Sequence, residues 1–155
     1  MLGAIAQNFQ NFYIKQPPIQ TIMKTQIKHI VLLLAAMAGL HVFANVTGMY
    51  ETRIIWIDKV LHIMAGIAIG MVWLVILQKR DEIQAAKLAH FMAIIGFVLL
   101  VAVAWEITEA LFWKYLPFYA EKWNLYSPDI KDLLGDIVAN LAGGILLGWV
   151  AVRKK

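Results

Sequence analysis

The chain has 155 residues, of which 61% are hydrophobic and 15% are charged, and it contains no cysteine. Soluble domains are about half apolar and a quarter charged, so this balance indicates a membrane protein with lipid as its surroundings. The lack of cysteine excludes disulfides, thiolate metal sites and thiol nucleophiles. The net charge of +4 comes without the interleaved basic and aromatic residues that stack on bases, so no nucleic-acid partner is expected.

The beginning of the chain allows two interpretations. We expect residues 1–27 to form a peripheral segment ahead of a transmembrane domain over residues 28–155. Read from Met23, however, a basic stretch followed by an apolar run resembles a signal peptide, and residues 1–22 would then be an upstream mis-start. The poor match to a cleavage site before Asn45 favours a retained membrane helix.

Four apolar runs are each long enough to cross a bilayer, which takes about 20 residues. They are Ile30–Met49, Asp58–Leu77, Leu88–Trp113 and Leu133–Val152, and none contains proline. A spanning strand would leave backbone groups unpaired in lipid, so each run is expected to be a helix. The sequence therefore predicts an all-α polytopic membrane protein with a four-transmembrane-helix bundle.

The link before the last helix, Lys114–Asp132, is long and aromatic. Its aromatic residues are Tyr115, Phe118, Tyr119, Trp123 and Tyr126, and it also holds Pro117 and Pro128. Tyrosine and tryptophan favour the headgroup region of a membrane. We expect an interfacial segment with a short helix rather than a free loop.

The basic residues predict the orientation of the bundle. Nine of the 14 lysines and arginines lie in the N-terminal segment, the second link and the tail, against five on the opposite side. Loops rich in lysine and arginine stay in the cytoplasm. We therefore expect both termini to be cytoplasmic, in a bacterial inner membrane.

Ionisable and amide residues recur within the predicted helices at spacings of three or four. They are Asp58 and His62 in the second helix, Glu106 and Glu109 in the third, and Asp132, Asp136 and Asn140 in the fourth. Such spacings place each set on one helix face. Because the helices alternate in direction, all three sets fall near the outer boundary. The pattern predicts an outward-opening polar pocket.

This chemistry is typical of a site for a hard or borderline divalent cation such as Mg²⁺, Mn²⁺ or Zn²⁺. The candidate ligands are Asp58, His62, Glu106, Asp132 and Asp136. The candidate catalytic acids and bases are His62, Glu106 and Glu109, and the candidate pocket residues are Asn140, His41 and Trp105. Carboxylates this close need protons or a cation, and Lys59 and Lys131 are near enough in sequence to neutralise them in part.

Several of these residues also have purely structural interpretations. Asp58 and Asp132 are suited to cap their helices, and Glu109 to sit at the interface. A lone His62 is typical of a hydrogen-bonded core histidine, and His41 of a residue that bonds a neighbouring helix. Glu106 and Asp136 lie deeper in apolar sequence, where a functional role is the default interpretation.

Three motifs carry a resemblance over about residues 54–150. Asp58-Lys59-x-x-His62 resembles the opening of a helix in VanZ-like membrane proteins, and the spacing of Asp136, Asn140 and the glycines after them is similar to the last conserved helix of that family. Glu106-x-x-Glu109 resembles the corresponding helix of the YjdF-type (DUF2238) inner-membrane proteins. Glu109 stands where the VanZ-like pattern has Gln, and the link before the last helix has no Arg. The resemblance implies a small multi-span protein of the cell envelope, in some cases linked to glycopeptide resistance.

Three functions are consistent with these observations. The first is metal-assisted chemistry on an envelope lipid or isoprenoid phosphate. The second is a small ion- or proton-coupled transporter, for which four helices would imply a homo-oligomer. The third is a non-catalytic envelope, resistance or assembly factor. A haem between His41 and His62 is disfavoured, because it would leave the carboxylates unexplained.

Overall fold

The computed structural model describes residues 19–50, 55–79, 87–125 and 130–153, and all regular structure within these ranges is helical. The helices are α2 (Ile19–Val46), α3 (Ile55–Lys79), α4 (Lys87–Tyr115), α5 (Pro117–Lys122) and α6 (Ile130–Arg153). Four of them, α2, α3, α4 and α6, are long and apolar enough to cross a membrane. The predicted all-α bundle of four transmembrane helices is confirmed.

Each long helix begins earlier than the apolar run that predicted it. The largest difference is in α2, which begins at Ile19 rather than Ile30. No proline or glycine lies between these positions, so the helix also includes the more polar residues that precede the apolar run. The part suited to the membrane is Gln26–Val46. Helix continuity, and not hydropathy, sets this boundary.

A glycine ends α2 at Val46 rather than at the predicted Met49. Gly48 adopts a left-handed conformation with φ 68°, and the Met49 amide then donates to the Ala44 carbonyl over 2.9 Å. This is the glycine-terminated C-cap, which returns the chain towards the helix and satisfies its last carbonyls.

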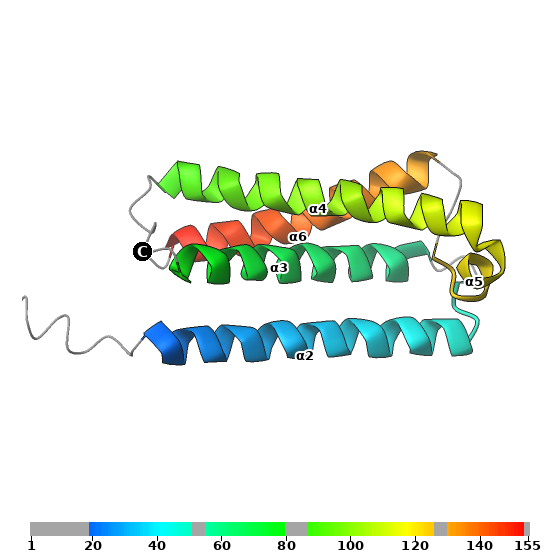
Figure 1. The fold of residues 1–155 in the computed structure, drawn as a ribbon, viewed down its shortest axis with the longest axis horizontal. Helices are drawn as coiled ribbons and strands as arrows, with labels where there is room; N and C mark the ends of the chain where they lie inside the picture. Colours follow the sequence, from blue (N-terminus) through cyan, green and yellow to red (C-terminus); the bar gives the residue numbers. More distant parts are fainter. Residues whose placement is uncertain (1–18, 51–54, 80–86, 126–129, 154–155) are drawn as a thin grey trace, which may run out of the picture.

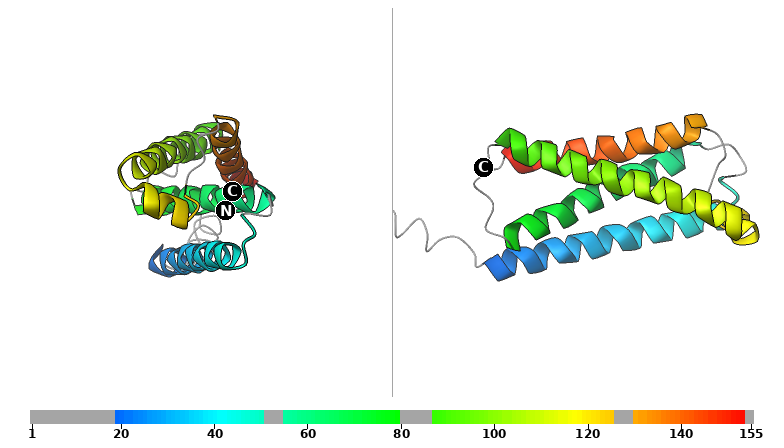
Figure 2. Two further views of the ribbon diagram at one scale, coloured as in Figure 1. Left: turned by 90° about the vertical axis from the view of Figure 1, so that its right-hand side faces the viewer. Right: turned by 45° about the horizontal axis from the view of Figure 1, so that its top comes forward.

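The bundle is not a simple ring of four (Figures 1 and 2). Helix α6, the last in sequence, lies beside both α3 and α4, whereas α2 packs along α3 and not along α4 or α6 within the described residues. The start of α2 and the end of α6 lie at one end of the bundle, and α5 lies at the other. The first turns of α3 and α6 and the last turns of α4 therefore lie at the same end of the bundle as α5.

Two glycines bring α3 and α6 into backbone contact. A Cβ atom placed on Gly66 would collide with the backbone carbonyl of Asn140, and one placed on Gly143 would collide with that of Ile63. Small residues allow this approach between membrane helices. The contact fixes the register of α3 against α6 one turn from His62.

A buried stripe runs along α4 at intervals of four residues. Ile94, Val98 and Ala102 are at most 1% exposed, and the next position in the stripe is Glu106, which is 5% exposed. Residues four apart share a helix face. The helix thus presents one carboxylic acid on its most buried face.

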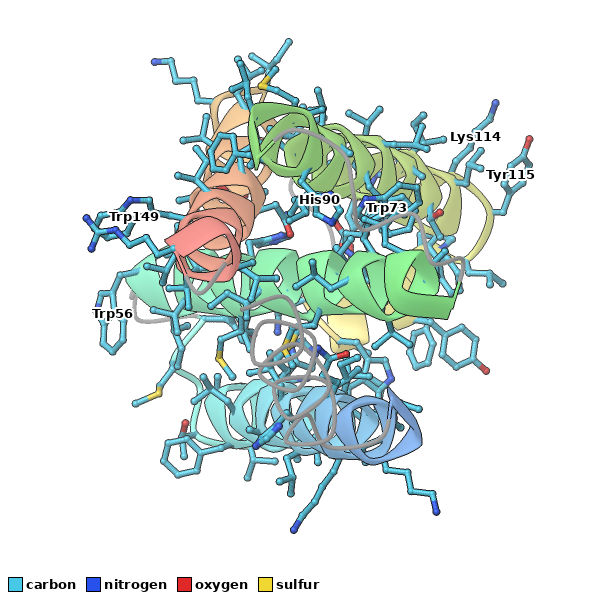
Figure 3. The ribbon with its side chains drawn as sticks, turned by 90° about the vertical axis from the view of Figure 1, so that its left-hand side faces the viewer. Trp56, Trp73, His90, Lys114, Tyr115 and Trp149 are labelled. Atoms are coloured by element: carbon cyan, nitrogen blue, oxygen red, sulfur yellow. The ribbon has the colours of Figure 1, made fainter. Side chains whose placement is uncertain are left out.

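The aromatic link forms α5 and an exposed surface around it. Phe118, Tyr119 and Trp123 are between 41% and 69% exposed, as suits side chains at a membrane interface. Trp56 and Trp149 also point outwards, whereas Trp73 and His90 lie between α3 and α4 (Figure 3). The predicted N-terminal segment up to residue 18, together with Tyr126 and Pro128 of the link, lies outside the described residues.

Candidate functional site

Lys59 lies at the centre of the polar groups that α3 and α6 bring together. Its Nζ is 2.6 Å from Asp132 Oδ1, 2.5 Å from Asp136 Oδ1 and 3.4 Å from Asp58 Oδ2. Lysine has a long flexible side chain and three donors, so it reaches across the helix contact and bonds both acidic residues of the first turns of α6. Three carboxylates against one ammonium group leave an excess of negative charge.

His62 is held by Asn140, which lies four residues after Asp136 on α6. The Asn140 side-chain nitrogen is 3.0 Å from the Asp136 backbone carbonyl, which can only accept, so this nitrogen is the donor. It is also 2.9 Å from His62 Nδ1, which must therefore accept. A neutral histidine that accepts at Nδ1 carries its proton on Nε2.

The proton on His62 Nε2 faces two carboxylates. Asp136 Oδ1 lies 3.3 Å from Nε2 and Asp58 Oδ1 lies 3.7 Å from it. Each of Asp58, His62 and Asp136 offers one ligand atom, and these atoms lie within 4.8 Å of one another. We call these three residues the Asp58–His62–Asp136 cluster.

The donor set of the cluster fits a divalent cation, since carboxylates and imidazole suit Mg²⁺, Mn²⁺ and Zn²⁺. Lys59 already holds the Asp136 oxygen that such an ion would use. A metal on His62 Nε2 would also need the proton moved to Nδ1, where the Asn140 nitrogen now donates. Lys59 and a metal ion are therefore alternative cations, and exchange requires Lys59 and Asn140 to turn away.

The two glutamates of α4 occupy different surroundings. Glu106 is buried, and its Oε1 has no hydrogen-bond partner among the described residues. Glu109 is half-buried and lines the cavity together with Trp105, four residues before it on the same helix. Neither glutamate belongs to the group of residues close enough to share one ion, nor does Asp132, whose carboxylate is taken by Lys59.

A cavity of about 500 Å³ lies between α2, α3 and α4 and reaches the cluster. Asp58, His62, Glu109 and Asn140 line its polar end, and the rest of its lining is largely apolar. The volume lies within the range of about 300–1,000 Å³ found for ligand pockets. The predicted pocket residues Asn140, His41 and Trp105 all contribute to its wall.

Hydrogen bonds tie α2 to the rest of the protein at this end. His41 Nδ1 is 2.8 Å from the Tyr50 hydroxyl. The Asn45 side chain donates to the Lys122 carbonyl over 3.2 Å and accepts from the Asn124 side chain over 3.1 Å. Asn45 thus binds the turn after α5, and only His41 of the two lines the cavity.

Asp58 and Asp132 do not cap their helices. Helix α3 begins at Ile55 and α6 at Ile130, so both aspartates lie inside the first turn. There they still face the positive end of the helix dipole, but their side chains bond Lys59. The sequence indicated Lys59 only as a neighbouring charge; the signal for its central place was a lysine within a membrane span, next to an acid.

The four membrane-suited helices and their buried polar cluster define this chain as a polytopic helical membrane protein with an intramembrane polar site. Residues 18–155 match the model of a family described as "Predicted membrane protein (DUF2238)", and the chain belongs to that family. The DUF2238 part of the resemblance is confirmed, whereas the VanZ-like part stays a prediction. No match was found among curated proteins or among solved structures.

Proposed function

We propose that this protein is a membrane enzyme of the bacterial cell envelope that acts on the polar head of a lipid, with the Asp58–His62–Asp136 cluster as its reactive centre. The observation that carries the proposal is the convergence of these three side chains from two helices beside a ligand-sized cavity with apolar walls. Ionisable groups in membrane helices are costly, which makes a functional role their default interpretation.

A divalent cation in exchange for Lys59 would be held by Asp58, His62 and Asp136. Such an ion supplies positive charge to a phosphoryl oxygen and lowers the pKa of bound water. Lys59, once its ion pairs with the aspartates are broken, stays near the same site and can bind the anionic head group of the lipid. Glu109 also lines the polar end of the cavity and can act there as an acid or base on the head group. An isoprenoid phosphate or another lipid phosphate fits these roles.

The first test is the metal content of the protein purified in detergent without chelators. We expect about one divalent ion per chain, or uptake of one ion from added Mg²⁺, Mn²⁺ or Zn²⁺ with a rise in melting temperature. His62→Gln and Asp136→Asn should abolish the uptake. Glu121→Gln, which changes an exposed acid on α5, is the matched control. If the purified protein contains no metal and none of the three ions changes its melting temperature, metal-assisted catalysis is excluded.

The second test is turnover of a lipid phosphate in liposomes, measured as released inorganic phosphate. We expect His62→Gln to lose activity by at least tenfold, while Glu121→Gln keeps it. Equal rates in the two variants would contradict a reactive role for the cluster.

A second function is favoured by one specific observation, the buried Glu106 oxygen that lacks a partner among the described residues. Buried carboxylates with nearby histidines relay protons in carriers, so a small proton-coupled transporter is the alternative. Flux through proteoliposomes driven by a pH gradient should then fall on Glu106→Gln. Flux that is unchanged by Glu106→Gln would remove this alternative.

A further inference from the structure

The cavity beside the cluster has one side that no described helix closes. Its walls come mainly from α2, α3 and α4, yet α2 packs against α3, and within the described residues no Cα atom of α2 lies within 8 Å of a Cα atom of α4. Leu34 on α2 and Trp105 on α4 line the cavity and are 49% and 50% exposed. The gap between α2 and α4 therefore opens sideways, towards the lipid that surrounds a membrane bundle.

The cavity is about as deep as one leaflet. Along α3 its lining runs from Asp58 to Ile69, and along α2 from His41 to Leu34. At 1.5 Å per residue these stretches span about 16 Å and about 10 Å. Half of a hydrocarbon core about 30 Å thick measures about 15 Å. The apolar part thus extends from the polar cluster to near the middle of the bilayer.

One end of the cavity is polar and the other is apolar, as are the two ends of a lipid molecule. The end near α5 presents Asp58, His62, Glu109 and Asn140, and the turn after α5 closes it with Asn124 and Leu125. The deep end presents only apolar residues. A soluble ligand would leave the deep end unmatched, whereas a hydrocarbon chain buries apolar surface along its whole length.

We propose that this cavity binds the hydrocarbon chain of a single lipid phosphate, which enters from one leaflet through the gap between α2 and α4. The head group comes to rest at the Asp58–His62–Asp136 cluster, so the inference rests on the proposed function for the nature of the head. The chain is held by Ala38, Ala65 and Ala102, whose small side chains leave its path open on three helices. These alanines select for the width of the chain, and Ile69 and Leu34 limit its length.

The experiment uses the full chain in liposomes with a lysophosphatidic acid probe that carries a diazirine at the end of its chain. After irradiation, adducts are mapped by mass spectrometry of peptides. We expect adducts at the deep end of the cavity, on the peptides that contain Leu34 and Ile69. Ala38→Trp, which fills the path, should reduce this labelling at least fivefold. Ala36→Trp is the matched control, because Ala36 is an exposed alanine of the same helix that does not line the cavity.

Three results would overturn the chain site. The first is equal labelling in the Ala38→Trp and Ala36→Trp variants. The second is adducts spread over the outer face of the bundle, such as at Val138, which is 64% exposed. The third is efficient disulfide cross-linking between copies through Ala38→Cys, the chain having no cysteine of its own, which would assign the gap to a second copy.

The experiments can contradict the binding site for the hydrocarbon chain and the proposed enzyme activity independently of each other. Site-specific labelling in a protein that neither takes up divalent ions nor releases phosphate supports the chain site and contradicts the enzyme. Phosphate release that survives Ala38→Trp, with labelling outside the cavity, contradicts the chain site and leaves the enzyme in place.

Discussion

Lys59 is the residue that forms the ion pairs between α3 and α6. It bonds Asp132 and Asp136, and its side chain is 25% exposed whereas that of Asp136 is 8% exposed. Removing one partner of a buried ion pair costs about 3–5 kcal/mol, and exposed pairs are worth much less. For this partly buried set we expect Lys59→Met to lower the free energy of unfolding by about 2–3 kcal/mol. Unfolding by titration with sodium dodecyl sulfate, followed by circular dichroism, measures the change.

The control for Lys59→Met is Lys122→Met, on the exposed surface of α5, which should change stability by less than about 0.5 kcal/mol. Adding Asp136→Asn to Lys59→Met should recover part of the loss, since the two groups are directly coupled. Equal stability of the Lys59→Met variant and the unchanged protein would show that the ion pairs contribute nothing.

Tyr50 provides a pH dependence outside the membrane spans. Burial, and to a lesser degree the charge of Asp58, raises the pKa of Tyr50 from 10.0 to about 12. The folded state therefore favours the protonated phenol, so its contribution to stability is complete below about pH 10 and disappears as the pH rises through about 12. Ultraviolet difference spectra should show a tyrosine that ionises near pH 12. Tyr50→Phe should remove this late phase, and its persistence would assign the phase to another residue.

At the scale of elements, the closest contact is between α3 and α6. An alanine at Gly66 would press its methyl group against the Asn140 carbonyl, which is backbone and cannot turn aside. We expect Gly66→Ala to separate the helices and to lower the free energy of unfolding by about 1–3 kcal/mol. The same substitution at Gly96, where nothing lies within 4 Å, should stabilise its helix by about 0.5–1 kcal/mol. A detergent unfolding series on both variants decides the prediction, and equal effects would contradict it.

Sequence periodicity predicts helix faces well and helix partners poorly. The spacing of Asp58 and His62, and of Asp136 and Asn140, placed each pair on one face, and the two pairs do meet. That Asn140 would direct the proton of His62 follows from the crossing of α3 and α6, which hydropathy does not encode. Glu106 is buried, but its position on the buried face of α4 keeps it outside the group of residues that could share an ion.

The site is least predictable where long side chains decide the outcome. Lys59 lies next to Asp58 in sequence, yet its ammonium group bonds residues of α6. Its four-carbon stem allows several directions, and only the packed neighbour selects one. In the same way, Asn45 bonds Asn124, because a cap at Gly48 ends α2 close to the turn after α5.

At the scale of the whole molecule, α5 lies at one end of the bundle, and the start of α2 and the end of α6 lie at the opposite end (Figure 1). Combined with the nine-to-five distribution of basic residues, we expect α5 and the cluster at the outer face. Single cysteines at Trp123 and Arg153 test this in a chain that has none. An impermeant maleimide should label the first in intact cells and the second only after permeabilisation. The reverse result would invert the orientation, and labelling of both in intact cells would show that α6 does not cross the membrane.

The pairing of α3 with α6 also has a consequence for biosynthesis. Lys59 and His62 leave the ribosome 73 to 78 residues before Asp132, Asp136 and Asn140, the partners that they bond on α6. Until the last span enters the bilayer, α3 presents those polar groups without these partners. Spans complete insertion first and associate afterwards. The polar end therefore assembles only at the end of synthesis. A chain truncated before α6 would expose the charged groups of α3 to lipid, and we expect such a chain to be degraded.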